Sequence, residues 1–319
     1  MKAIRSLLLG LALLCPGFAM AQDFPTRPIH LIVPFPPGGP NDIIARVVGK
    51  RMSEILKQTI VVDNRAGQGG VLGTDVVAKS APDGYTIGIV SAGALAISPS
   101  MEKVAYDSLK DLQPVTLVAK VPEMLVVATS VPAHNMAELV ALAKKEPGKL
   151  NFASSGAGSM PHLAGELLKL TAKIDITHVP YRGAAPALQD VMASQADMAF
   201  DPGIAFPHIK AGKVKLLAVA SDKKSPFFPN VPTYADLGIK DASLDIWFGL
   251  WVPNNTPAEV SARLTREVTK ILASPAVKQR FGDQGAEPVA LEAAEFKKLL
   301  AQEGKTLSAL IKDRKIIVE

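Results

Sequence analysis

Short apolar runs rich in β-branched residues alternate along this 319-residue chain with longer segments in which apolar residues recur every three or four positions. The short runs predict strands, and the periodic segments predict amphipathic helices. Before residue 92, the pattern predicts strands over residues 29–35, 59–63 and 85–91 and helices over residues 41–56 and 71–79. Strands that alternate with helices in this way indicate an open α/β unit.

The alternation starts again after residues 112–129, a long β-like stretch that Pro122 interrupts. Beyond it, helices are predicted over residues 136–145, 161–171 and 185–194, and strands over residues 150–153, 174–180, 198–200 and 214–220. This part of the chain therefore predicts a second α/β unit.

The remaining chain favours a return to the first unit. Prolines at positions 226, 229 and 232 mark a crossing segment, and residues 245–252 form an apolar run typical of a strand buried on both faces. Two amphipathic helices follow, over residues 257–272 and 291–313. We expect a first lobe of residues 22–124 and 222–319, an inserted second lobe of residues 125–221, and hinges at two crossings, near residues 121–125 and 220–226.

The N-terminus has the pattern of a cleavable export signal. Lys2 and Arg5 precede an apolar run over residues 7–14, and a small-residue cleavage site ends at Ala21, before Gln22. The run is shorter than the roughly 20 residues that a membrane span needs. We therefore expect cleavage between Ala21 and Gln22 and a periplasmic location.

Composition narrows the possible functions. The chain is 48% hydrophobic and 20% charged, which is typical of a globular protein, and its formal net charge of +5 is scattered without a basic run. Its single cysteine lies inside the predicted signal, so a disulfide framework and a cysteine zinc module are excluded. The histidines are isolated. We expect no metal, no cofactor and no nucleic-acid partner.

Three loops between a strand and a helix contain glycine, and ligands of open α/β sheets bind at such loops. The first runs from Phe35 through Pro37, Gly38 and Gly39 to Asp42, with Asn41 or Asp42 as a possible helix cap. It either approaches a ligand with its backbone or forms a tight turn without one.

The second loop contains Ser155, Gly156, Gly158 and Ser159. Hydroxyl and N–H groups gather there without a fixed charge, which suits a carboxylate or a phosphate. A dinucleotide fingerprint would need Gly or Ala where Pro161 stands, so nucleotide binding is disfavoured.

The third loop holds Tyr181, Arg182 and Gly183. Tyr181 either forms a wall of the site or covers core, and Arg182 either clamps a ligand or stays solvated. Asp201, at the end of a predicted strand, either contacts a ligand or forms a turn with the Pro and Gly that follow.

Catalysis has little support. Ser159 and His162 are three residues apart and could meet on a helical turn, as in an exported α/β hydrolase, but no serine lies in the G-x-S-x-G elbow of that class. His162 fits better as a helix cap, or as a residue behind those that contact a ligand, than as a catalytic base.

Four motifs carry a resemblance to a known family. They are residues 27–42 (RPIHLIVPFPPGGPND), 63–70 (DNRAGQGG), 82–86 (PDGYT) and 179–183 (VPYRG). In this order the chain resembles the Bug-type, TctC-like extracytoplasmic solute receptors of tripartite tricarboxylate transporters. The resemblance implies a two-domain α/β periplasmic binding protein of type II-like Venus-flytrap fold, with its ligand cleft between the lobes.

It also implies a receptor rather than an enzyme, without a cofactor. The ligand would be a small mono- or dicarboxylate, with an acidic amino acid or an aromatic acid as possibilities, and the receptor would be a monomer that delivers it to membrane permease subunits. A receptor that signals to a sensor protein is the alternative. The expected ligand-binding residues are Phe35, Pro37, Gly38, Gly39, Asp42, Ser91, Ala92, Ser155, Gly156, Gly158, Ser159, His162, Tyr181, Gly183 and Asp201.

Overall fold

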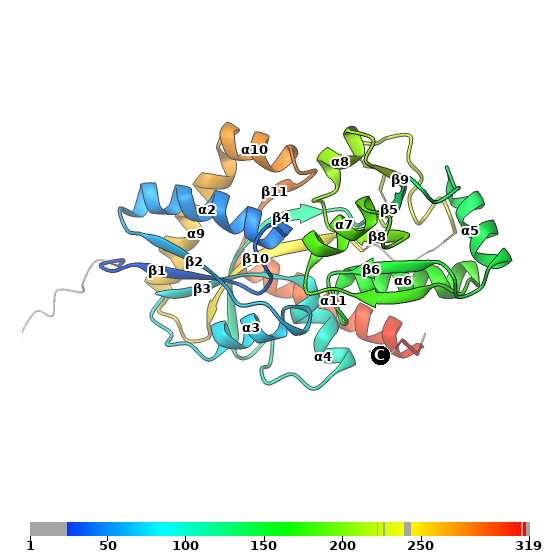
Figure 1. Cartoon of the computed structure of the whole chain (residues 1–319). Coiled ribbons are helices and arrows are strands. Elements are labelled where there is room, and N and C mark those ends of the chain that lie inside the picture. Colours follow the sequence, from blue (N-terminus) through cyan, green and yellow to red (C-terminus); the bar gives the residue numbers. More distant parts are fainter. Residues whose placement is uncertain (1–23, 222, 226, 239–243, 314, 317–319) are drawn as a thin grey trace, which may run out of the picture.

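The computed structural model describes residues 24–221, 223–225, 227–238, 244–313 and 315–316. The expected export signal over residues 1–21 and its cleavage site lie outside the described residues. The described chain forms two β-sheets, each flanked by helices, which lie side by side in Figure 1. Within these ranges, the search for a helix both long and apolar enough to cross a membrane finds none.

The first sheet has six strands in the order β11-β4-β10-β3-β1-β2. Its strands are β1 Ile29–Val33, β2 Ile60–Asn64, β3 Thr86–Ser91, β4 Leu112–Val121, β10 Ile246–Pro253 and β11 Glu287–Leu291. β2, β1 and β3 are parallel, whereas β10, β4 and β11 add to them in antiparallel pairs. The parallel pairing of β1 with β3 brings the loops that follow these two strands to one edge of the sheet.

The second sheet has five strands in the order β7-β6-β8-β5-β9. Its strands are β5 Met124–Ala128, β6 Asn151–Ser154, β7 Thr177–Pro180, β8 Met198–Asp201 and β9 Val214–Val219. Here too, three parallel strands are extended by antiparallel ones. The two predicted α/β units are thus both present, and each directs the carboxyl ends of its parallel strands to one edge.

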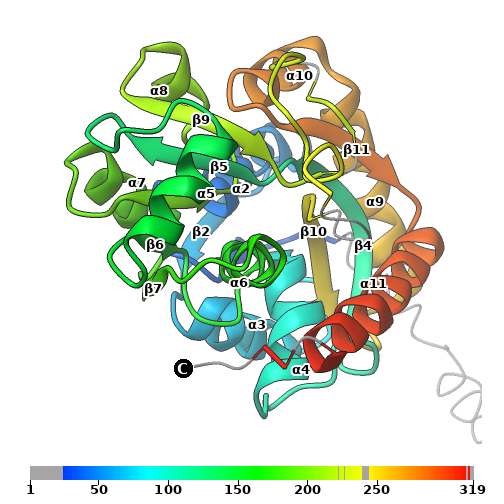
Figure 2. The same ribbon diagram turned by 90° about the vertical axis from the view of Figure 1, so that its right-hand side faces the viewer.

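Helices cover the faces of both sheets (Figures 1 and 2). They are α2 Pro40–Leu56, α3 Val71–Ala78, α4 Ser98–Met101, α5 Met136–Lys145, α6 Met160–Ala172, α7 Ala184–Met192, α8 Phe206–Lys210, α9 Ala258–Ala273, α10 Pro275–Gly282 and α11 Ala293–Asp313. A 3₁₀ turn, η1 (Gln68–Gly70), precedes α3, and a π-helical turn, η2 (Gly93–Ile97), precedes α4. α2 packs against α9 and α10 on one face of the first sheet, and α3 lies on the other face.

The apolar run at residues 245–252 forms β10, in which every residue is buried. Trp247 and Trp251 of this strand pack on Phe296 of α11, with ring centroids 5.1 and 4.8 Å apart. The prediction of a strand covered on both faces is confirmed, and the last helix supplies one of its covers.

The chain passes between the sheets twice. β4 ends at Val121 and β5 begins at Met124, so the break predicted at Pro122 is the first crossing. The second joins β9 of the second sheet to β10 of the first. The two crossings touch, because the N–H of Ala220 donates to the carbonyl of Glu123 at 2.8 Å. The lobe boundaries given above stay predictions.

Several elements were not expected from the pattern. They are the short helices α4 and α8, the helix α10, and the edge strand β11, after which α11 begins at Ala293 rather than at residue 291. β11 is only partly buried and pairs irregularly with β4. Its sequence has no regular alternation of apolar and polar residues, so the pattern did not indicate a strand there.

Candidate functional site

A cavity lies between the two sheets, and loops that follow β1, β3, β6, β7 and β8 form its walls. It contains about 490 Å³ of space not filled by protein atoms, part of which is open to solvent. The described residues that line it are apolar or uncharged polar, and none of them carries a charge. Any attraction for an ion at its walls must therefore come from dipoles.

Three helices begin at this cavity. They are α2 with Gly39 as its N-cap residue, α6 with Ser159, and α7 with Gly183, and all three N-cap residues line the walls. The first N–H groups of a helix have no acceptor within the helix and form the positive end of its dipole. A cavity at three such ends, two from the second sheet and one from the first, is suited to an anion.

The N-termini of α2 and α7 differ from that of α6 in their capping. Within the described residues, no side chain caps either helix. Asn41 and Asp42 therefore do not act as caps, contrary to expectation. The side-chain amide of Asn41 instead donates to the carbonyl of Ile89 at 3.2 Å, which fixes the start of α2 to β3. A ligand oxygen can take the place that a capping side chain would fill.

The loop between β6 and α6 is held by its own polar groups. Gly156 and Gly158 have φ angles of +128° and +74°, which side chains other than glycine rarely adopt. The hydroxyl of Ser159 donates to the carbonyl of Gly156 at 2.6 Å and accepts the N–H of His162 at 3.4 Å. This hydroxyl is occupied by the backbone, so Ser159 and His162 do not form a nucleophile and base pair.

The floor of the cavity comes from the first sheet. Ser91 ends β3, Gly93 follows it in η2, and Ile246 and Phe248 project from β10. Phe35 adds an aromatic wall next to them. The cavity thus combines backbone polar groups with apolar walls, as ligand sites commonly do.

The expected site residues divide into three groups by position. Those on the cavity wall are Phe35, Gly39, Ser91, Ser155, Ser159 and Gly183. Gly156 and Tyr181 line an adjoining cleft that shares Phe35 and Ser155 with the cavity. Pro37, Gly38, Asp42, Ala92, Gly158, His162 and Asp201 do not line the cavity.

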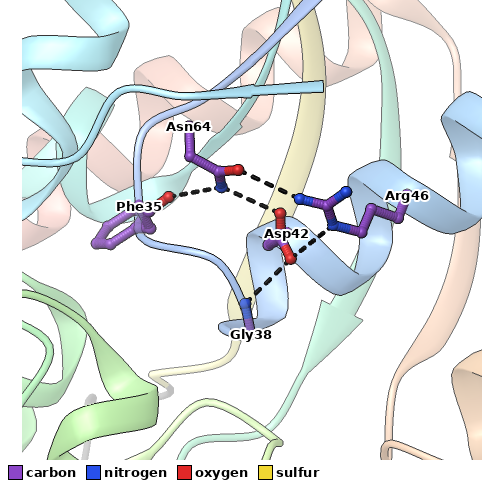
Figure 3. A network of polar contacts seen from close by, with 5 residues as sticks. All are labelled: Phe35, Gly38, Asp42, Arg46 and Asn64. Carbon is purple, nitrogen blue, oxygen red and sulfur yellow. Dashed lines mark hydrogen bonds and ion pairs between the residues drawn. The ribbon is translucent and has the colours of Figure 1, made fainter. Parts of the chain in front are cut away.

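Asp42 supports the first loop from behind (Figure 3). Its carboxylate accepts the N–H of Gly38 at 3.0 Å, the guanidinium of Arg46 at 2.9 Å and the amide of Asn64 at 3.0 Å. The same Asn64 amide donates to the carbonyl of Phe35 at 2.9 Å. Burial alone would raise the pKa of Asp42, but the hydrogen bonds from Arg46, Gly38 and Asn64 outweigh it and lower this pKa.

Tyr181 and Asp201 also have partners in the protein. The hydroxyl of Tyr181 donates to Asp190 of α7 at 2.6 Å, and burial together with this bond raises its pKa to about 12. One carboxylate oxygen of Asp201 accepts the N–H groups of Gly203 and Ala205 at 2.9 and 2.7 Å. Asp201 therefore builds the turn after β8, the second of its two predicted interpretations.

A second carboxyl group lies in the interior beside Asp201. Glu123, between β4 and β5, has no exposed surface, and neither of its carboxyl oxygens has a hydrogen-bond partner among the described residues. Burial and the neighbouring Asp201 raise its pKa well above the usual value. Burial also raises the pKa of Asp201, to about 7.

Sequence reasoning missed several wall residues, namely Pro36, Pro40, Asn41, Gly69, Gly93, Met160, Pro161, Ala184, Ala185, Pro186, Pro202, Ile246 and Phe248. Many of them adjoin an expected residue in the same loop. Nothing in the sequence indicated that Ile246 and Phe248 line the cavity, because an apolar run looks the same whether helices or a ligand cover the strand.

Comparison with known proteins gives the family. Residues 44–316 match the model of the tripartite tricarboxylate transporter family receptor. The periplasmic binding protein BugD is 34% identical, with a TM-score of 0.88 over 93% of this chain and 100% of that one.

Two further structures contain ligands. A protein of R. palustris solved with adipate is 33% identical, with a TM-score of 0.88 over 92% of this chain and 99% of that one. MatC from Rhodopseudomonas palustris, with bound malate, is 32% identical, with a TM-score of 0.86 over 90% of this chain and 100% of that one.

These similarities extend over both sheets and the cavity between them. The expected two-domain Venus-flytrap fold is confirmed by them, and so is the expectation of a receptor rather than an enzyme. The chain therefore belongs to the receptor family of the tripartite tricarboxylate transporters, and it is a solute-binding protein of the periplasmic binding protein type.

Proposed function

We propose that this receptor captures a small mono- or dicarboxylate in the cavity between its lobes and delivers it to the membrane subunits of a tripartite tricarboxylate transporter. The observation that carries the proposal is the meeting of three helix N-termini at a cavity lined by uncharged residues. Adipate and malate in the two similar structures support the same ligand class.

The capture step follows from the two-lobe arrangement. The N-terminus of α2 belongs to one sheet and those of α6 and α7 to the other, so all three reach one ligand only when the lobes are closed. A carboxylate then shifts the population toward the closed form by its higher affinity for that form. We propose the crossings at residues 121–125 and 220–226 as the hinges, and residues 22–124 with 222–319 and residues 125–221 as the lobes.

The wall residues supply the proposed contacts. Backbone N–H groups at Gly39 and Gly183 face the anion, with the Ser91 and Ser155 hydroxyl groups beside them, and Phe35 and Phe248 contact its carbon atoms. In the same proposal, residues 1–21 direct export to the periplasm and are removed there.

Thermal shift and calorimetry with malate and adipate test the proposal. At a ligand concentration a hundred times Kd, binding stabilises a protein by about 2.7 kcal/mol, which raises Tm by several degrees in a chain of this size. The matched controls are the diamides of both acids, which keep shape but lack charge, and 1,4-diaminobutane. Stabilisation by the diamides or the diamine alone would overturn the carboxylate assignment.

The partner requires a separate experiment. Pull-down with the ligand-loaded receptor is expected to retain the permease subunits. Retention of a membrane sensor protein instead would favour the signalling alternative.

A further inference from the structure

Two histidines lie directly behind the loop that carries Ser155 and Ser159. His162 is in the first turn of α6, and His178 is in β7. Their rings stack with centroids 4.2 Å apart and planes 16° apart, and His178 also stacks on Phe152 at 4.8 Å. Neither histidine lines the cavity. They are placed to act on the loop and not on a ligand.

His162 binds the loop through one ring nitrogen. Its Nδ1 accepts the backbone N–H of Gly158 at 3.2 Å. A nitrogen that accepts a hydrogen bond carries no proton, so the neutral ring must carry its proton on Nε2. Because His162 is only 2% exposed, no water competes freely for this bond.

His178 reaches the loop through a serine. Its Nε2 lies 2.7 Å from the hydroxyl of Ser154, and that hydroxyl accepts the N–H of Gly156 at 3.1 Å. Each of the two glycines with positive φ is therefore connected to one ring of the stacked pair. Burial lowers the pKa of His162 to about 4 and that of His178 to about 3, so both rings are neutral near pH 7.

We propose that His162 and His178 are positioning residues that fix the backbone of Gly156 and Gly158 so that the N-terminus of α6 is presented to the ligand. The inference rests on the proposed function, since it assigns these residues to the same carboxylate site. A proton on Nδ1 of His162 would oppose the N–H of Gly158 with a second donor and would break the arrangement.

Matched variants of His162 separate the effect of ring stacking from the effect of the Nδ1 acceptor. His162→Phe keeps an aromatic ring for stacking but removes the acceptor, whereas His162→Asn keeps an acceptor near the position of Nδ1 and removes the ring. Calorimetry with malate and adipate is expected to give a loss of about tenfold in affinity for His162→Phe, the order of effect when a buried N–H loses its acceptor. His162→Asn is expected to regain most of the affinity even if its Tm is lower. The exposed His134, changed to Phe, is the control.

Wild-type affinity in His162→Phe would overturn the proposal, and so would equal losses in the Phe and Asn variants. A second measurement needs no ligand. Long-range ¹H–¹⁵N NMR spectra of the free protein are expected to show His162 as the Nε2–H tautomer, with the Gly158 amide shifted in His162→Phe and nearly unchanged in His162→Asn. A His162 that is protonated on Nδ1, or that titrates like an exposed histidine, would refute the positioning role.

The two failures can be told apart. Absence of carboxylate binding by the wild-type protein, together with the expected tautomer and amide shifts, would contradict the proposed function while the link between histidine and loop stands.

Discussion

Gly69 and Ala157 meet across the cleft, where a Cβ atom built on Gly69 would lie 2.7 Å from the carbonyl oxygen of Ala157. Gly69 belongs to η1, beside the first sheet, and Ala157 to the loop after β6 of the second. A methyl group between these two backbones would force them apart. This contact between the lobes therefore requires glycine at position 69.

Gly69→Ala is expected to weaken carboxylate binding by disfavouring lobe closure. Small-angle scattering with saturating malate or adipate would show a larger radius of gyration than for the wild type. Gly212→Ala is the control, because Gly212 also has positive φ, +68°, but a Cβ there has no atom of the described residues within 4 Å. It is expected to lose only about 1 kcal/mol of stability, and equal affinities in both variants would argue against the closure contact.

Asn64→Ala is expected to loosen the first loop. The change removes the donor to both Phe35 and Asp42 and costs about 1–3 kcal/mol in unfolding free energy, as expected when buried acceptors lose their partner. Denaturant unfolding measures this cost, and Asn151→Ala, at another half-buried amide, is the comparison. An unchanged affinity in Asn64→Ala would show that the loop does not depend on the network in Figure 3.

Asp201 is expected to make the protein less stable as pH rises. Its pKa is raised to about 7 in the folded state from 3.8, so its stabilising contribution is complete below pH 3.8 and is lost between pH 3.8 and 7. The loss is a few kcal/mol at most. Glu123 acts in the same direction, and Tyr234 is the other titratable group that faces it.

Denaturation midpoints measured from pH 4 to 8 test this for Asp201→Asn. The amide oxygen still accepts the N–H groups of Gly203 and Ala205, so the turn is retained while the titration is removed. The slope of stability against pH is expected to become flatter than in the wild type. A slope identical to that of the wild type would show that groups other than Asp201 cause the pH dependence.

The stacked histidines His162 and His178 are expected to make the protein less stable as pH falls. Burial lowers the pKa of His178 to about 3 and that of His162 to about 4. Their contribution is complete above pH 6.5 and is lost as pH falls through these values. His178→Phe keeps the stack and removes one titrating group, so its stability is expected to fall less steeply from pH 6 to pH 4. A decline as steep as that of the wild type would contradict this.

Local patterns predicted the parts of this molecule that local forces determine. The strand at residues 245–252 and the break at Pro122 are examples, because burial and backbone restriction act there within a few residues. The edge strand β11 was not predicted, because it is half-exposed and pairs irregularly.

The site residues, too, were predictable only where local sequence determines their position. Ser155 and Ser159 lie on the cavity wall, where glycine and serine after a strand suggested they would. Asp42 could not be assigned from its own loop, because its partner Asn64 comes 22 residues later, on a neighbouring strand. Long-range pairing of this kind decides whether a polar residue faces a ligand or the protein.

The absence of charged groups among the described wall residues has a consequence for the medium in which the receptor works. Salt shortens the reach of surface charges from about 30 Å at 0.01 M to about 3 Å at 1 M, but it does not enter a closed cavity where dipoles touch the anion. The affinity for the proposed carboxylate is therefore expected to be nearly the same in dilute buffer and in concentrated salt.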